Sequence, residues 1–254
     1  MKEPLQVLHG YPPHDRSLHA LLRSRADTLA DAPFLHMEQG DWSWRQLERA
    51  VDGAAAWLHG RGVAHGERVV VVARNHPGHV ILLLALARLG AIMVPVNPDF
   101  KRDELAYILG HCQPVGIFCG SEQRELAAAA RGPAGPWVVE LDGARGEFDD
   151  IVRTAPSAGI DGGGADDTCI LIYTSGTTGF PKGVMHSQRT LALVGEMSVA
   201  RVHLQPWDVM YVVLPLFHIN ALFYSLLGAM TAGARVLIRS RFSASEERIA
   251  SRFV

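Results

Sequence analysis

Residues 173–184 read Tyr-Thr-Ser-Gly-Thr-Thr-Gly-Phe-Pro-Lys-Gly-Val and continue directly from an apolar run over 168–173. The run predicts a buried strand, and the glycines after it allow backbone amides to approach a ligand closely. Successive amides in such a turn form a concave anion site, to which hydroxyls and Lys182 add donors and a positive charge. The segment predicts a strand followed by a polyphosphate-binding loop. An ordinary Ser/Thr/Gly-rich surface loop between a strand and a helix is the alternative.

The loop is not a Walker A motif. That motif requires a second glycine five residues after the first, with a lysine next to it. Five residues after Gly176 stands Pro181, so the spacing fails. A P-loop ATPase or GTPase is therefore disfavoured.

The string Thr174–Gly183 resembles the phosphate-loop signature of the adenylate-forming (AMP-binding) superfamily, which contains acyl-CoA synthetases, peptide-synthetase adenylation domains and luciferases. The signature runs Thr-Ser-Gly-Ser/Thr-Thr-Gly-x-Pro-Lys-Gly, and every position matches. The resemblance implies an α/β fold of mostly parallel sheets flanked by helices, the front portion of the family's large N-terminal domain. It also implies a set of ATP phosphate-binding residues: Thr174, Ser175, Gly176, Thr177, Thr178, Gly179 and Lys182.

Three other segments match the same family. Residues 90–98 resemble its Gly-Ala-x-x-x-Pro-Val-Asn-Pro segment and residues 42–47 its aromatic-Ser-aromatic turn, both taken as architecture. Residues 214–218, Leu-Pro-Leu-Phe-His, resemble the segment whose histidine lies at the mouth of the acyl pocket, so the resemblance implies a substrate-pocket role for His218. A structural histidine at the end of an apolar strand is the alternative. Ala221 stands where many family members have glycine. The sequence Phe-His-Ile-Asn-Ala at 217–221 is most similar to that of crotonobetaine/carnitine–CoA ligases.

Outward from the loop, helical and strand patterns alternate. Strands are predicted near 68–73, 91–94, 115–119, 137–141, 208–214 and 235–238, and helices near 17–29, 43–58, 78–89, 101–111, 122–131, 187–203, 219–232 and from 243. Ser43 and Gln46 form a predicted capping box. Repeated strand–helix–strand units indicate a mostly parallel sheet. We divide the chain into a first α/β part, about 1–165, and a part of about 166–254 with the phosphate loop, joined by a flexible glycine-rich connector near 158–167.

Composition adds limits on partners. With 24 Lys and Arg against 26 Asp and Glu in 254 residues, the net charge of −2 favours neither nucleic acid nor an anionic membrane as a partner. The three cysteines have no CxxC spacing, which is typical of reduced thiols in a cytoplasmic protein. The longest apolar run, 80–96, contains Arg88, Gly90 and Pro95, so no transmembrane segment is predicted. No catalytic or metal-ligating residue can be assigned, and the oligomeric state stays open.

By resemblance, we expect the complete enzyme to convert a carboxylic acid with ATP and Mg²⁺ into an acyl-adenylate, and then with CoA into a thioester. The family's Mg²⁺-binding segment, ribose-binding aspartate and C-terminal domain have no counterpart before Val254. We therefore expect a fragment that binds ATP weakly and is inactive alone, with its Mg²⁺ ligand outside this chain. A peptide-synthetase adenylation domain, a non-catalytic nucleotide-binding module and a folded remnant without function remain alternatives.

Overall fold

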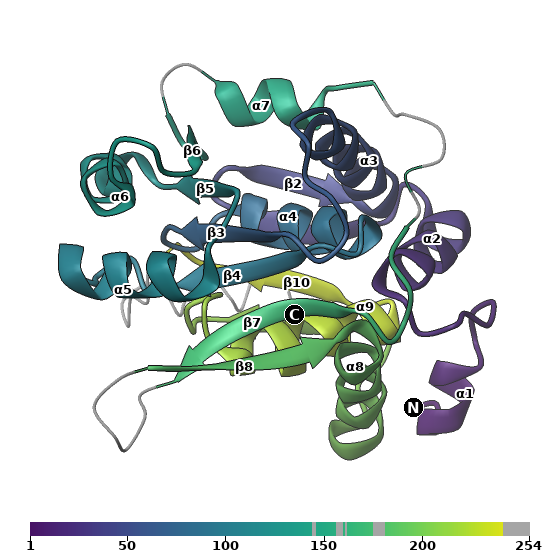
Figure 1. Cartoon of the computed structure of the whole chain (residues 1–254). Helices are drawn as coiled ribbons and strands as arrows, with labels where there is room; N and C mark the ends of the chain where they lie inside the picture. The colour runs from purple at the N-terminus through teal and green to yellow at the C-terminus, as the bar shows by residue number, and fades with distance from the viewer. Residues whose placement is uncertain (144–145, 156–159, 161, 175–180, 241–254) are drawn as a thin grey trace.

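The computed structural model describes residues 1–143, 146–155, 160, 162–174 and 181–240 (Figure 1). Two sheets organise this part of the chain. The strands, in chain order, are β1 (Pro33–Met37), β2 (Gly40–Ser43), β3 (Arg68–Val72), β4 (Ile92–Val96), β5 (Gly116–Cys119), β6 (Trp137–Glu140), β7 (Thr168–Thr174), β8 (Lys182–Ser187), β9 (Val209–Val212) and β10 (Arg235–Ile238). The predicted α/β class with mostly parallel sheets is confirmed.

Helices pack against both sheets. They are α1 (Pro4–Leu8), α2 (Leu18–Leu29), α3 (Trp44–Gly60), α4 (Pro77–Arg88), α5 (Arg102–Cys112), the 3₁₀ turn η1 (Ser121–Gln123), α6 (Arg124–Arg131), α7 (Glu147–Val152), α8 (Gln188–Val202), the π-helix η2 (Asn220–Leu227) and α9 (Gly228–Ala232). The predicted capping box is confirmed, because Ser43 accepts from the Gln46 amide at 3.2 Å while Gln46 accepts from the Ser43 amide at 2.8 Å.

The larger sheet has the order β6-β5-β3-β4-β7-β8, and only the β7–β8 pair is antiparallel. Alternate valines of β3 enter different cores. Val69 and Val71 belong to the main core with α3 and α4, while Val70 and Val72 belong to a smaller core beneath α5. A strand covered on both faces requires an unbroken apolar run, because successive side chains point to opposite faces. The run of four valines follows from this requirement.

The smaller sheet has the order β2-β1-β10-β9, so strands within residues 33–43 pair with strands within residues 209–238. Both sheets combine strands from either side of residue 166, so the division of the sequence near residue 165 does not separate one sheet from the other and stays a prediction. Every residue from Pro77 to Ala87 in α4 is buried. A helix that is apolar on all sides is typical of a core position, and α4 lies in the main core to which both sheets contribute.

Three sequence expectations need correction. The strand β4 passes through Pro95, which was expected to end it; the register of β4 with β7 reaches only Met93, so Pro95 removes no hydrogen bond from that ladder. The residues after the glycine-rich loop form strand β8 and not loop leading directly to a helix. Gly162 and Gly163, expected in a flexible connector, are bonded to the end of α4, because both amides donate to the Arg88 carbonyl, at 3.0 and 2.9 Å. A side chain at Gly163 would meet the Ala87 carbonyl. The helix predicted from 243 lies outside the described residues.

Candidate active site

The base of the glycine-rich loop is a β-hairpin. Strands β7 and β8 pair from Thr168↔Ser187 to Thr174↔Lys182, so Thr174 and Lys182 stand opposite each other where the loop begins and ends. Both residues are exposed. The predicted ligands Ser175, Gly176, Thr177, Thr178 and Gly179 lie outside the described residues. The hairpin therefore carries the Thr174 hydroxyl just before the loop and the Lys182 ammonium group just after it.

Helix α5 contacts both ends of the loop. The Tyr107 hydroxyl lies 3.5 Å from the Pro181 carbonyl, just before Lys182, and His111 Nδ1 lies 2.6 Å from the hydroxyl of Tyr173, just before Thr174. The rings of Tyr107 and His111 stack with centroids 6.0 Å apart. Burial raises the pKa of Tyr173, so its hydroxyl stays protonated at neutral pH. Two residues one helical turn apart thus hold the chain on each side of the loop.

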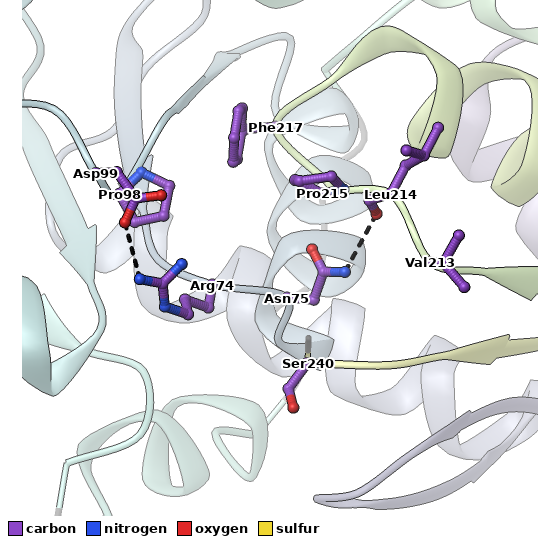
Figure 2. A pocket seen from close by; sticks show the side chains of 9 residues that line it. All are labelled: Arg74, Asn75, Pro98, Asp99, Val213, Leu214, Pro215, Phe217 and Ser240. Carbon is purple, nitrogen blue, oxygen red and sulfur yellow. Dashed lines mark hydrogen bonds and ion pairs between the residues drawn. The ribbon is translucent and has the colours of Figure 1, made fainter. Parts of the chain in front are cut away.

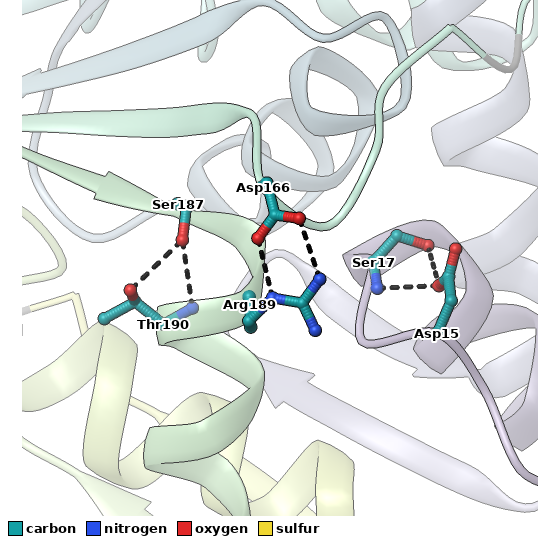
Figure 3. A network of polar contacts seen from close by, with 6 residues as sticks. All are labelled: Asp15, Ser17, Asp166, Ser187, Arg189 and Thr190. Carbon is teal, nitrogen blue, oxygen red and sulfur yellow. Dashed lines mark hydrogen bonds and ion pairs between the residues drawn. The ribbon is translucent and has the colours of Figure 1, made fainter.

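The opposite end of the hairpin is also fixed (Figure 3). Ser187 ends β8 and caps α8 by accepting from the Thr190 amide at 3.2 Å. Arg189 makes two hydrogen bonds, 2.7 and 2.9 Å long, to the Asp166 carboxylate that precedes β7. A bidentate pair of this kind fixes orientation as well as distance. The strands that carry the loop are therefore anchored at both ends.

A cavity of about 510 Å³ lies at the carboxyl ends of strands from both sheets (Figure 2). Its lining follows β3, β4, β9 and β10 and consists of Arg74, Asn75, Pro98, Asp99, Val213, Leu214, Pro215, Phe217 and Ser240. The single cation, Arg74, pairs with Asp99 at 2.8 Å and lies 3.5 Å from Glu122. Apolar side chains dominate the rest. Ligands of open α/β sheets bind at this edge, and the cavity suits an uncharged, largely apolar group.

Asn75 joins the two sheets beside this cavity. Its Nδ2 donates to the Leu214 carbonyl at 3.2 Å (Figure 2). The same Nδ2 donates to the Arg239 carbonyl at 2.8 Å, and Oδ1 accepts from the Leu216 amide at 2.7 Å. The side chain is 6% exposed. One amide thus uses three hydrogen bonds to hold the chain after β9 and β10 against the end of β3, and so shapes the cavity wall that carries Phe217.

A second cavity, of about 180 Å³, adjoins the first through Arg74 and Asn75. From β3 the chain continues to β4 on one side, then returns past β3 to β5 on the other. This reversal between β3 and β5 is a topological switch point, where binding crevices of such sheets form. The cavity is lined there by His76, Gly120, Gln123 and Asp142.

His76, which is half-buried and lines this cavity, and the fully buried His79 make stability pH-dependent. Burial lowers the pKa of His76 to about 4 and that of His79 to about 3. Because the folded values lie below the unfolded value of about 6.5, the unfolded chain binds more protons between these limits. The contribution of these two histidines to the free energy of unfolding is fully present above pH 6.5. It falls as the pH drops towards 4, by up to about 2.7 kcal/mol per pH unit for two protons.

Urea unfolding between pH 4 and 8 tests this expectation. A variant with His76→Asn, which keeps a residue able to cap α4, and His79→Leu is expected to show a shallower loss of stability below pH 6.5 than the unmodified chain. Equal slopes in the two proteins would show that other groups cause the acid sensitivity.

His218 is exposed and does not line the 510 Å³ cavity, whereas its neighbour Phe217 does. The two rings lie 4.4 Å apart. The π-helix η2 starts at Asn220, and its Phe223 packs edge-to-face on His186 of β8 at 4.9 Å. π-Helical turns often occur at functional sites. The contact links the loop hairpin to the segment that carries His218, whose predicted role at the substrate pocket stays a prediction.

Comparison with known proteins decides the family. A family model described as AMP-binding enzyme matches residues 22–252, which is most of the chain. This chain belongs to the AMP-binding enzyme family. The family resemblance inferred from the loop is therefore confirmed.

Relatives of this AMP-binding chain include acid–CoA ligases. It is 31% identical over 251 residues to the medium/long-chain-fatty-acid–CoA ligase FadD6 of Mycobacterium tuberculosis, covering 95% of this chain and 41% of that protein. It is 28% identical over 219 residues to crotonobetaine/carnitine–CoA ligase of Escherichia coli, covering 80% of this chain and 41% of that protein. The chain thus spans about two-fifths of the length of these curated relatives.

Solved structures agree on the fold. ATP-bound MatB from Rhodopseudomonas palustris matches with a TM-score of 0.81 and 28% identity, over 92% of this chain and 47% of that one. The inhibitor-bound N-terminal domain of FACL13 from M. tuberculosis matches with a TM-score of 0.81 and 24% identity, over 91% of this chain and 58% of that one. The predicted front portion of an adenylate-forming N-terminal domain is confirmed as the fold of this AMP-binding chain.

Other expectations for the AMP-binding chain meet mixed outcomes. The three cysteines are free and buried, as expected of thiols. No described helix has the length and apolar character needed to cross a membrane. Within the described ranges, no cluster of three or more His, Cys, Asp or Glu side chains could hold a metal ion. A Mg²⁺ ligand outside this chain stays a prediction.

Sequence reasoning missed Arg74 and Asn75 in this AMP-binding chain. A usable signal was present, because two polar residues follow a run of buried valines. Polar side chains at the carboxyl end of a parallel strand lie where ligands bind. Their partners could not be read, since Leu214 and Arg239 lie 139 and 164 residues away from Asn75.

Proposed function

We propose that this chain supplies the phosphate-binding part of an enzyme that activates a carboxylic acid with ATP and transfers the acyl group to the thiol of CoA. The carrying observation is the complete phosphate-loop signature at 174–183, borne by a hairpin fixed at both ends in a chain of the AMP-binding family. Acid–CoA ligases among the relatives support the acceptor thiol. The whole activity belongs to a longer protein of the relatives' length.

The chemistry explains why such a loop is needed. A carboxylate is a poor electrophile, because it is anionic and lacks a good leaving group. Its attack on the α-phosphorus of ATP expels pyrophosphate and forms a mixed anhydride, which a thiol then cleaves with loss of AMP. Negative charge spreads over phosphate oxygens during the first step, so oriented donors and cations lower its barrier.

We assign roles to the residues on this basis. Thr174, Ser175, Gly176, Thr177, Thr178 and Gly179 hold the β- and γ-phosphates, and Lys182 neutralises charge on the departing pyrophosphate. Lys182 is exposed at the end of the hairpin, and no salt bridge to it occurs in the described part of the chain. Its ammonium group is therefore available to a nucleotide. Mg²⁺ would add charge on the same phosphates.

The 510 Å³ cavity gives the substrate's uncharged portion a place. Its cation is neutralised by Asp99, so a second anion gains little from Arg74. The apolar side chains of Val213, Leu214 and Phe217 favour a hydrocarbon or other uncharged group. The carboxylate would lie outside this cavity, on the side of His218.

Acid-dependent exchange between labelled pyrophosphate and ATP tests the proposal. The protein encoded by the full reading frame is assayed with a panel of linear, branched and aromatic acids, followed by CoA. We expect exchange that requires an acid and a CoA thioester as product. Exchange with amino acids and transfer only to a carrier-protein thiol would identify a peptide-synthetase adenylation domain. Nucleotide binding without exchange would identify a non-catalytic module and refute the proposal.

A further inference from the structure

An exposed histidine of α5 contacts the end of the β7–β8 hairpin, and no step of the proposed reaction uses it. His111 lies in the last turn of α5. Its Nδ1 is 2.6 Å from the Tyr173 hydroxyl, and the two rings meet edge-on with centroids 5.6 Å apart. The two residues are 62 positions apart in the chain, so this hydrogen bond joins separate elements of the fold.

Tyr173 is held on the α5 side of the sheet. It pairs with Gly183 of β8, and a Cβ atom at Gly183 would lie 3.6 Å from Cζ of the tyrosine ring. The ring therefore lies next to the β8 backbone, and its hydroxyl reaches α5. Burial raises the pKa of Tyr173, and the neighbouring Cys112 thiol raises it further, so the hydroxyl keeps its proton at neutral pH.

Tyr107, one helical turn before His111, supports the histidine ring. The two rings stack at an interplanar angle of 22° with centroids 6.0 Å apart. The Tyr107 hydroxyl is 3.5 Å from the Pro181 carbonyl, which is long for a hydrogen bond and therefore weak. The shorter contact, between His111 and Tyr173, is thus the stronger link between α5 and the hairpin.

This link lies next to two of the predicted phosphate ligands. Thr174 and Lys182 form the last pair of the β7–β8 ladder, and Tyr173 with Gly183 forms the pair before it. The Thr174 hydroxyl donates to the Lys182 carbonyl at 3.5 Å, and both side chains are exposed. The ends of secondary-structure elements open most easily. A hydrogen bond from α5 to the preceding pair therefore opposes opening of the Thr174–Lys182 pair.

We propose that His111 is a positioning residue for ATP binding, acting through Tyr173 on the Thr174–Lys182 pair. The inference rests on the proposed function, in which this pair contacts the phosphates of ATP. Without the hydrogen bond to His111, the nucleotide itself has to order the pair, and the free energy of this ordering is lost from binding. Bound ATP then holds the pair in place, so the chemical step is little affected.

Acid-dependent pyrophosphate exchange by the protein encoded by the full reading frame tests this role. His111→Leu is expected to raise the KM for ATP about two- to tenfold, the scale of one hydrogen bond, and to leave kcat and the KM for the acid within about twofold. His111→Asn is expected to restore most of the affinity, because its amide both donates and accepts. His59→Leu is the matched control, since His59 is also an exposed histidine in the last turn of a helix, α3.

Two results would contradict the positioning role in an active protein. One is a KM for ATP that is the same in His111→Leu as in the unmodified protein. The other is an equal rise in His59→Leu. A lower kcat and lower stability with unchanged KM would mean that His111 has only a structural role. Absence of activity in the unmodified protein would instead refute the proposed function itself.

Tyr173→Phe tests whether His111 acts through the tyrosine. The variant keeps the ring and removes the hydroxyl, so a rise in the KM for ATP like that of His111→Leu is expected. The double variant is expected to be no worse than either single variant, because both remove the same hydrogen bond. Effects that multiply would show that His111 acts by another contact and would overturn the proposal.

Hydrogen exchange in the absence of nucleotide gives a readout that does not depend on catalysis. The backbone amides of residues 173–174 and 182–183 are expected to exchange about two- to tenfold faster in His111→Leu, because the end of the ladder loses one hydrogen bond to α5. His59→Leu is expected to leave their exchange unchanged. Equal rates in His111→Leu and the unmodified protein would show that α5 does not hold the hairpin, whatever the protein catalyses.

Discussion

Lys182→Ala in the complete enzyme is expected to slow adenylate formation by about one to three orders of magnitude, the scale of losing one oriented group that stabilises developing charge. Lys182 is the first residue of β8 and pairs with Thr174, the last residue of β7. The lysine therefore lies at the base of the loop. Thr178→Ala is expected to have an effect in the same range, because it removes a hydroxyl donor from the signature. The measurement is acid-dependent pyrophosphate exchange under saturating acid.

Folding has to be separated from chemistry in this experiment. The Lys182 side chain is exposed, and an exposed substitution away from caps and ion pairs changes stability by only about 0.5 kcal/mol. Lys2→Ala serves as the matched control, since it removes another exposed ammonium group far from the loop in sequence. Exchange that is unchanged in both Lys182→Ala and Thr178→Ala would remove the loop from the mechanism.

Strong local patterns made much of the fold predictable. The valine run of β3, the capping box of Ser43 and Gln46, and the strand over 235–238 each carry their own signal. In these places, propensity and burial require the same structure, so local sequence is sufficient.

Strand β8 was missed for a physical reason. Its sequence, Lys-Gly-Val-Met-His-Ser, contains a glycine and lacks a clean alternation of apolar and polar residues. It is an edge strand whose partner, β7, supplies the hydrogen bonds, and Met185 is 68% exposed. Strand formation that depends on a partner leaves little trace in the strand's own sequence. The π-helical geometry of η2 could not be predicted from its own sequence either. An apolar pattern with helical spacing predicts a helix, but it does not distinguish the hydrogen-bond spacing of a π-helix from that of an α-helix.

The candidate site was predicted unevenly for a related reason. The loop residues form one contiguous string, so the signature identifies all of them together. The cavity is assembled from four strand ends, and its central residue, Asn75, acts through main-chain groups that have no side-chain identity. Main-chain carbonyls and amides are present at every position. The side chains of Leu214, Leu216 and Arg239 therefore give no sequence signal for these hydrogen bonds.

Asn75→Ala is expected to destabilise the chain by about 2–4 kcal/mol, because it leaves the Arg239 carbonyl and the Leu216 amide without their buried partner and removes a partly buried bond to the Leu214 carbonyl. Chemical denaturation monitored by tryptophan fluorescence measures the loss. Asn75→Asp is the discriminating variant: a carboxylate still accepts from the Leu216 amide but cannot donate to the Leu214 and Arg239 carbonyls. If Asn75 joins the sheets mainly by donating, the aspartate is at least as destabilising as alanine at pH 7. A cost below about 1 kcal/mol for both variants would mean that packing alone holds the two sheets together here.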